Sequence, residues 1–348
     1  MADTMKCIVK ARPEPDGLEM QERSIPRPSH GKVLIKVQTA AICGTDLHIF
    51  NWDHWSRERV HVPRIIGHEF AGKVVETGPD VEHLKVGDYV TGEGHLTCGF
   101  CRNCRMGDGH VCENWRGIGY DVDGCFAEYI VHPELNTWLN DETLPPHVAA
   151  IQDPLGNAIH TVFAADCIGN DVAVFGLGPV GLLAVAVLKA IGAARIFAID
   201  WDNHYRMDIA GRLGAHHVIA ASEKNAVDYV MERTSGKGLD VVLEVSGSPE
   251  ALQDGLRCLR MAGDLVLIGT SNKTVSLDIT NDVVFRAINI HGITGRRLWH
   301  TWYKMKGLLA SGNLEVEPII THRLPFDDFH KGFELMQAAR CGKVVLEL

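Results

Sequence analysis

The sequence lacks the features that mark membrane, secreted and nucleic-acid-binding proteins. No apolar run reaches the roughly 18 residues that a membrane-spanning helix needs, and residues 1–17 contain no apolar signal-peptide core. Positive charge is in deficit, because 34 Lys and Arg face 44 Asp and Glu, which gives a net charge of −10. Nucleic acids and anionic membranes select basic surfaces, so we expect no nucleic-acid partner, no membrane partner and a cytoplasmic location.

Internal repeats and low-complexity segments are also missing from the sequence. Hydrophobic residues make up 46% and charged residues 22%, which is typical of an ordinary globular protein. A single hydrophobic core rarely serves more than about 250–300 residues. The 348 residues therefore predict two domains.

The pattern of predicted secondary structure changes near Asp153. Before it, short apolar runs separated by Gly and Pro predict strands at 33–42, 71–78, 87–94 and 126–132. After it, strands alternate with helices, which indicates βαβ units and a parallel sheet covered on both faces. The strands are expected within 171–193 and at 195–200, 217–220, 241–247 and 264–269, and the helices at 204–215, 226–234 and 250–259.

The sequence pattern changes again from about Gly295, where helices are expected at 296–312 and 326–339 and a last strand at 343–348. We therefore predict an α/β protein. A β-rich domain would comprise 1–153 and 295–348, and a doubly wound, parallel-sheet Rossmann domain would comprise 154–294.

A glycine-rich turn marks a candidate dinucleotide site. The segment Gly176-Leu-Gly178-Pro-Val-Gly181 follows an apolar strand and opens a helix, which is the context that gives this pattern its meaning. The first glycine permits the tight turn, the second admits the pyrophosphate, and the third lets helix and strand pack closely. Asp200 ends the next strand, where a carboxylate binds ribose hydroxyls and repels a 2′-phosphate, so NAD is favoured over NADP. Arg206 lies nearby in sequence and is the residue that could serve a 2′-phosphate instead.

Four of the ten cysteines are clustered. Cys98, Cys101, Cys104 and Cys112 have the spacing C-x2-C-x2-C-x7-C, which can close a tetrahedral shell around one Zn²⁺ and leave no open position. Such a closed site is structural. An iron–sulfur cluster can use similar spacing and stays an alternative.

Three further segments carry potential catalytic groups: Cys43-Gly44-Thr45-Asp46-Leu47-His48, Gly67-His68-Glu69 and Asp153-Pro154-Leu155-Gly156-Asn157. Each is weak alone, since the chain has 18 histidines. Together with the glycine turn and the cysteine loop, they resemble the zinc-containing medium-chain alcohol dehydrogenase family over essentially the whole length. The resemblance implies a GroES-like catalytic domain, a catalytic zinc held by Cys43, His68 and Glu69, and a structural zinc at the four cysteines.

The same resemblance assigns further roles. Thr45 and His48 match the hydroxyl-to-imidazole proton relay of the family. Asp153 stands where many relatives carry a cysteine or glutamate; because aspartate is shorter, a role through water or in proton transfer is an alternative to ligation. The cofactor is expected to contact one residue of the glycine turn and residues at two later strand ends: Val180, Ile268, Gly269, Thr270, Ile293 and Thr294.

Longer stretches, 42–55, 92–104, 153–161, 292–303 and 319–323, resemble the branch of the family that oxidises L-threonine at C3 to 2-amino-3-oxobutanoate. Members of that branch are usually homotetramers. His95 matches a position that bears on substrate choice. Arg296 is a candidate partner for the substrate carboxylate, and Trp52 and Trp55 are candidates for a lid.

Three other functions compete with this interpretation. A sorbitol- or xylitol-type polyol dehydrogenase would share the fold, zinc and NAD and differ in its substrate pocket. A non-catalytic descendant would have lost zinc ligands or the relay, whereas Cys43, His68, Glu69, Thr45 and His48 are all present. A zinc-loop nucleic-acid binder would need a basic surface, which the net charge disfavours.

Overall fold

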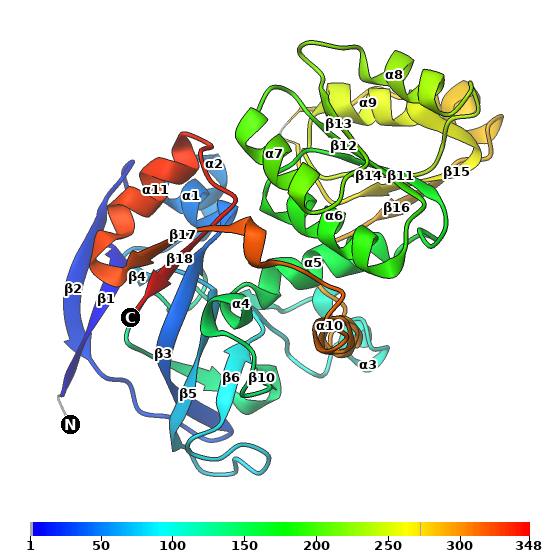
Figure 1. The fold of residues 1–348 in the computed structure, drawn as a ribbon. Coiled ribbons are helices and arrows are strands. Elements are labelled where there is room, and N and C mark those ends of the chain that lie inside the picture. The colour runs from blue at the N-terminus through cyan, green and yellow to red at the C-terminus, as the bar shows by residue number, and fades with distance from the viewer. Residues whose placement is uncertain (1–2, 272) are drawn as a thin grey trace. The chain divides into compact units, whose positions relative to one another are not determined.

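The chain divides into two units where its sequence texture changes. In the computed structural model, which describes residues 3–271 and 273–348, the first unit is Met1–Asp153 with Ile320–Leu348, and the second is Pro154–Ile319 (Figure 1). The chain returns to the first unit at Ile320, later than the predicted residue 295. The reason is local: Gly295 and Arg296 bind His160 and Asn157, which belong to the second unit.

A seven-stranded sheet organises the first unit. Its strand order is β10-β6-β5-β3-β18-β17, and β9 pairs with β3 beside this path. The strands are β3 (Lys32–Ile42), β5 (Glu69–Thr77), β6 (Tyr89–Gly92), β9 (Tyr129–Pro133), β10 (Thr137–Leu139), β17 (Ile320–Pro325) and β18 (Lys343–Glu347). The last strand of the chain thus lies next to β3 in antiparallel register, with Val344 opposite Ile42. Residues from both ends of the sequence share one hydrophobic core.

Two smaller sheets and several helices complete the first unit. The three-stranded sheet has the order β2-β1-β4, and β7 pairs with β8. The strands are β1 (Thr4–Lys10), β2 (Leu18–Ser24), β4 (Arg64–Ile65), β7 (His95–Leu96) and β8 (Arg116–Gly117). The helices are α1 (Gly44–Asn51), α2 (His54–Arg59), α3 (Arg102–Arg105), α4 (Pro146–Ala150) and α11 (Phe329–Gln337), and α5 (Gln152–Val162) begins in this unit and continues into the second.

The second unit is built on a six-stranded, all-parallel sheet. Its order, β13-β12-β11-β14-β15-β16, is that of a doubly wound dinucleotide-binding fold. The strands are β11 (Asp171–Phe175), β12 (Arg195–Asp200), β13 (His217–Ala220), β14 (Leu239–Glu244), β15 (Leu259–Leu267) and β16 (Asn289–Gly292). The helices are α6 (Pro179–Ile191), α7 (His204–Arg212), α8 (Ala226–Arg233), α9 (Pro249–Cys258) and α10 (His300–Ala310).

Several predicted elements begin later than the sequence pattern indicates, and local contacts explain two of these differences. Strand β9 starts at Tyr129 rather than at 126, because Phe126 and Ala127 pair with β1 through the bond from Ile8 N to Phe126 O (2.8 Å). Helix α10 starts at His300 rather than at 296. The preceding Arg296 is buried and its guanidinium donates to Asn157 Oδ1 (3.2 Å), which holds that stretch outside the helix.

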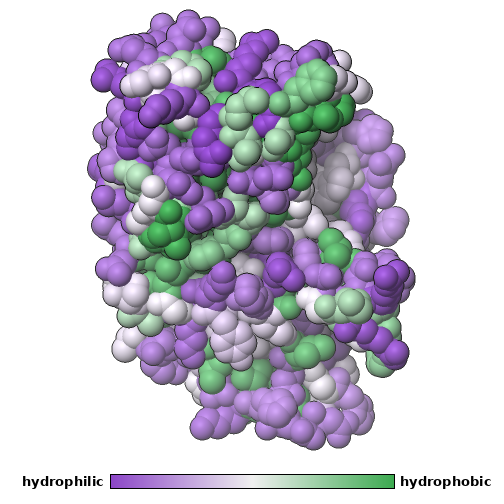
Figure 2. Space-filling model, turned by 90° about the vertical axis from the view of Figure 1, so that its right-hand side faces the viewer, coloured by the Kyte–Doolittle hydropathy of each residue, from purple (hydrophilic) through white to green (hydrophobic). Residues whose placement is uncertain are grey.

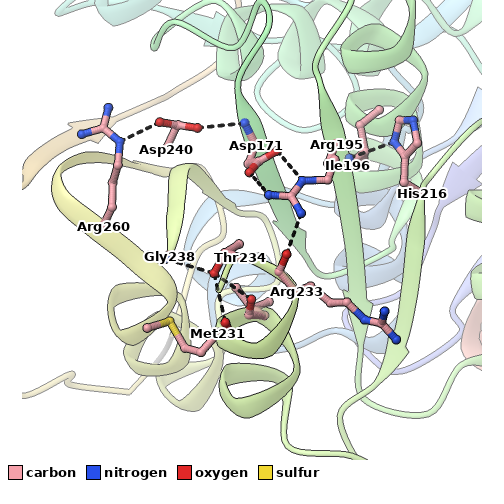
Figure 3. A network of polar contacts seen from close by, with 11 residues as sticks. Asp171, Arg195, Ile196, His216, Met231, Arg233, Thr234, Gly238, Asp240 and Arg260 are labelled. Atoms are coloured by element: carbon pink, nitrogen blue, oxygen red, sulfur yellow. Dashed lines mark hydrogen bonds and ion pairs between the residues drawn. The ribbon is translucent and has the colours of Figure 1, made fainter. Parts of the chain in front are cut away.

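A polar network joins the amino ends of the central parallel strands (Figure 3). Arg195 binds the Asp171 carboxylate with two nitrogens and also donates to Arg233 O (2.6 Å). Asp240 accepts from Asp171 N (2.9 Å) and from Arg260 Nε (2.6 Å). Ligands of open α/β sheets bind at the opposite, carboxyl edge, so this network serves the register of β11, β12 and β14 rather than binding.

The surface is mixed in polarity. The face in Figure 2 is mostly hydrophilic, with hydrophobic residues gathered in separate patches, as is normal for folded chains. Among residues 3–271 and 273–348, no helix combines the length and apolar character that crossing a bilayer requires.

Candidate metal centres and dinucleotide site

The sheet of the first unit brings three potential metal ligands together at the ends of two neighbouring strands. Cys43 follows the carboxyl end of β3, while His68 and Glu69 stand at the amino end of β5. These strands are antiparallel, with Ala41 opposite Glu69, so the end of one lies beside the start of the other. Their ligand atoms all lie within 4.8 Å of one another.

The chemistry of this trio fits a zinc ion. One thiolate, one imidazole and one carboxylate leave a fourth position open, as in catalytic zinc sites. His68 and Glu69 are buried, and His68 Nδ1 has no hydrogen-bond partner among the residues that the structure describes. Burial disfavours a charged imidazole, yet Cys43 and Asp46 raise the pKa of His68 to about 10. The surroundings therefore favour a cation at this position, which a divalent metal supplies.

Two buried charged side chains, Asp46 and Lys343, contact the three candidate ligands. Asp46 accepts from Cys43 N (2.9 Å) and lies 3.8 Å from His68 Nδ1. Lys343, the first residue of β18, donates to Glu69 Oε1 (2.7 Å), lies 2.6 Å from Oε2, and donates to Ile42 O (2.8 Å). Burial lowers the pKa of Lys343, but the facing Glu69 carboxylate reverses this and raises it above its ordinary value. The ammonium therefore stays charged and holds the Glu69 carboxylate in place.

Asp153 lies in α5 and is buried close enough to influence His68 and Glu69 electrostatically. Among the described residues, the converging ligand set consists of Cys43, His68 and Glu69, without Asp153. This arrangement agrees with the shorter reach of aspartate. A role for Asp153 beside the metal stays a prediction.

Thr45 and His48 share one face of α1, since residues three apart on a helix are neighbours. Cys43 Sγ lies 3.9 Å from Thr45 Oγ1, so the threonine hydroxyl stands next to the candidate zinc ligand. His48 is largely exposed and its Nδ1 lies 2.5 Å from Asp53 Oδ2. The pair thus leads from the metal trio towards solvent, as a proton relay requires.

The four clustered cysteines form a second centre. Cys112 Sγ lies 3.5 Å from Cys98 Sγ and 3.8 Å from Cys101 Sγ, and all four thiols are free. Sulfurs bound tetrahedrally to zinc at roughly 2.3 Å lie about 3.8 Å apart, far beyond a disulfide bond. Backbone N–H groups of Cys98 and Cys101 point at sulfurs of this set (both 3.3 Å). The arrangement fits a closed structural zinc site.

The glycine turn of the second unit has the three expected properties. Gly176 follows β11 with φ +96°, which only glycine adopts readily. A Cβ at Gly178 would meet nothing within 4 Å, so the backbone there is open to a ligand. A Cβ at Gly181 would lie 1.9 Å from Gly176 O, which explains the close packing of α6 on the turn.

The other candidate cofactor residues gather at the same carboxyl edge. Asp200 ends β12 and its carboxylate accepts from Leu177 N (2.7 Å) within the glycine turn. Arg206 lies in the first turn of α7, whose N-cap Asn203 accepts from Arg206 N (3.1 Å). The remaining residues follow the ends of β15 and β16: Ile268, Gly269, Thr270, Ile293 and Thr294. Because the strands are parallel, all of these residues share one edge of the sheet.

Comparisons with known proteins match this architecture in both units. The family described as "Alcohol dehydrogenase GroES-like domain" matches residues 29–141, and "Zinc-binding dehydrogenase" matches 179–311. An L-threonine 3-dehydrogenase from Caldanaerobacter subterraneus subsp. tengcongensis is 47% identical over 347 residues, covering 99% of each chain. One from Pyrococcus furiosus is 46% identical and covers 100% of each chain.

The chain belongs to the zinc-containing medium-chain alcohol dehydrogenase family. A solved structure of similar fold, described as a short chain alcohol dehydrogenase from Escherichia coli CFT073 complexed with NADH, has a TM-score of 0.91, 28% identity and full coverage of both chains. The predicted fold class, a GroES-like domain with a parallel-sheet Rossmann domain, is confirmed.

Not every predicted residue of this medium-chain dehydrogenase lies as expected. Trp52 is wrong as a lid, because it is buried in the core with the Lys10 ammonium 5.0 Å from its ring. Trp55 is partly exposed and packs edge-on against Tyr120, with centroids 5.6 Å apart. His95 packs edge-on against Trp115 at 4.9 Å. The substrate roles of His95, Trp55 and Arg296 stay predictions.

Sequence reasoning missed three residues of the site: Asp46, Asp53 and Lys343. Asp46 lies within the quoted cysteine segment, and its position three residues after an N-cap signals a capping role. Lys343 lies 274 residues from Glu69, and only the pairing of β18 with β3 brings them together. A lysine that opens an apolar terminal strand was the one available signal.

Proposed function

We propose that this protein oxidises L-threonine at C3 to 2-amino-3-oxobutanoate and transfers the hydride to NAD. Two observations support the proposal. Relatives that are 46–47% identical over at least 99% of their length carry the name L-threonine 3-dehydrogenase. The convergence of Cys43, His68 and Glu69 within 4.8 Å, with a relay threonine beside the cysteine, supplies the required chemistry.

We infer that Cys43 and His68 bind a catalytic zinc and that Glu69 binds it or stands directly behind it. When bound there, zinc acts as a Lewis acid that lowers the pKa of the substrate C3 hydroxyl, and NAD accepts the hydride. The chain's own task is to fix the ligands, which Lys343 and Asp46 do by holding Glu69 and Cys43. The tetrathiolate loop would bind the second, structural zinc.

The hydroxyl proton must leave the buried site as the substrate is oxidised. Thr45 can accept and donate a proton without becoming charged, and His48 exchanges protons with water because its side chain is 60% exposed. Asp153 is proposed to assist beside the metal. Asp153→Asn separates its roles, since lost activity with retained zinc favours proton transfer over ligation.

We assign NAD rather than NADP on the position of Asp200. Its carboxylate is fixed at the strand end by Leu177 N and Trp201 N (2.7 and 2.8 Å), where a 2′-phosphate would meet negative charge. A homotetramer is the assembly that the resemblance implies, and a cytoplasmic location is the one that the sequence predicts. Light scattering of the purified protein tests the subunit number.

Initial rates of NADH formation test the function. The substrates are L-threonine, D-threonine, L-serine, sorbitol and a plain secondary alcohol, each with NAD or NADP. Preference for L-threonine with NAD, abolished in Cys43→Ser and retained in Cys7→Ser, supports the proposal. Cys7 is a buried cysteine of β1, outside both metal sites, and is the matched control. Turnover of sorbitol in place of threonine would replace the substrate assignment with a polyol.

A further inference from the structure

The turn between α1 and α2 places the carboxylate of Asp53 against the imidazole of His48. Trp52 ends α1 in the left-handed conformation (φ 52°) and is buried, and Asp53 N donates to His48 O (3.4 Å). The chain therefore passes from α1 to α2 within two residues. Asp53 Oδ2 comes to lie 2.5 Å from His48 Nδ1.

The Asp53 carboxylate is itself held rigidly. Asp53 is the N-cap of α2, and its Oδ1 accepts from both Ser56 N and Ser56 Oγ (3.0 Å each). Ser56 is fully buried. One oxygen is thus bound to the helix, while the other is left for the imidazole.

The geometry decides which nitrogen of His48 carries the proton. An ionised carboxylate only accepts hydrogen bonds, so Nδ1 must donate and the neutral ring must have Nε2 as its acceptor. Burial raises the pKa of Asp53, but the bonds from Ser56 and His48 outweigh it and lower the pKa below the ordinary value, so the carboxylate stays ionised.

We propose that Asp53 is a positioning residue of the proton relay: it fixes His48 in the Nδ1–H tautomer so that Nε2 exchanges the proton. This inference rests on the proposed dehydrogenase function, in which His48 takes the proton released through Thr45. The proton binds Nε2, the resulting imidazolium is stabilised by Asp53, and the proton then passes to bulk water. Nδ1 keeps its own proton throughout, so the ring returns to the starting tautomer.

The first variant is Asp53→Asn. Asparagine keeps the size and the cap to Ser56, but it can present an amide N–H to Nδ1 and so favour the Nε2–H tautomer. We expect kcat to fall roughly 10- to 100-fold, with KM, zinc content and melting temperature unchanged. Added imidazole should restore part of kcat. Asp53→Ser, which retains a capping hydroxyl without the carboxylate, should behave in the same way.

The matched control is Asp80→Asn. Asp80 Oδ2 lies 2.6 Å from His30 Nδ1 in another Asp–His pair of the first unit, which is more exposed than the pair of His48 and Asp53 and lies outside the proposed site. This variant should keep the rate of the unaltered protein. Asp53→Asn combined with His48→Gln should be no slower than His48→Gln alone, because the aspartate acts only through the histidine.

Nitrogen-15 NMR of the His48 ring reports its tautomer, which would not change if Asp53 had only a structural role. The unaltered protein should show the Nδ1–H tautomer and Asp53→Asn the Nε2–H tautomer. The NMR measurement needs no substrate, so it stands even if the enzyme oxidises an alcohol other than threonine. An Asp53→Asn protein with unchanged kcat and unchanged tautomer would overturn the proposal, as would a loss of rate that tracks loss of zinc or stability.

Discussion

The ion pair between Lys343 and Glu69 provides a quantitative test of how the metal site is supported. Both side chains are at most 1% exposed, and the ammonium also donates to Ile42 O. Lys343→Met keeps the length and apolar stem of the side chain and removes the charge. In metal-free protein, the buried Glu69 carboxylate would then lose the cation that contacts it directly.

Removing one partner of a buried ion pair costs about 3–5 kcal/mol, because the remaining charge is desolvated without compensation. Urea unfolding of the metal-free proteins should show this loss. The comparison isolates the pair, since the tetrathiolate centre is emptied in every variant alike. The double variant Lys343→Met/Glu69→Gln should recover much of the loss, because it removes both charges together.

Lys6→Met is the matched control. Lys6 also pairs with an acid, Asp327 at 3.1 Å, but the two side chains are 51% and 64% exposed. Such pairs contribute about 0–1 kcal/mol. A loss for Lys343→Met no greater than that for Lys6→Met would refute the reasoning that Lys343 holds the Glu69 carboxylate through a desolvated charge pair.

Three further outcomes follow from the structure. Gly178→Ala should fold normally, because the added Cβ meets nothing within 4 Å, but it should weaken NADH binding about tenfold in a fluorescence titration. Gly181→Ala should instead lower the stability of the protein, because its Cβ would collide with Gly176 O. His132 is buried, and burial lowers its pKa to about 4. Because this folded-state pKa lies below the unfolded-state value of 6.5, about 3 kcal/mol of stability that is present above pH 6.5 should be lost as the pH falls to 4. The variant His132→Gln should flatten this pH dependence of stability. Cys101→Ser should bind one zinc per chain instead of two by atomic emission, and unfold at lower temperature.

Much of the fold was predictable because its signals are local. The run 171–181 places strand, turn and helix in sequence, and β11 and α6 lie there as expected. The cysteine loop was equally local, since its four ligands fall within residues 98–112. Periodicity and spacing suffice where neighbours in sequence are neighbours in space.

The remainder depends on contacts that no local pattern encodes. The support of Glu69 by Lys343 requires β18 to pair with β3, a register set by packing between the two ends of the chain. The burial of Trp52 follows from the left-handed turn that ends α1, so a residue expected to be a mobile lid belongs to the core. The tie between His48 and Asp53 depends on the same turn.

The central claim is oxidation of threonine at C3 by hydride transfer to NAD, and deuterium labelling tests it most directly. L-threonine carrying deuterium at C3 is incubated with the zinc-loaded protein and NAD, and the reduced cofactor is analysed by mass spectrometry. We expect one deuterium in the nicotinamide ring of each NADH formed, and no label in the NADH formed from threonine deuterated only at its methyl group. Unlabelled NADH from the C3-deuterated substrate, or no NADH from fully metallated protein, would contradict the account.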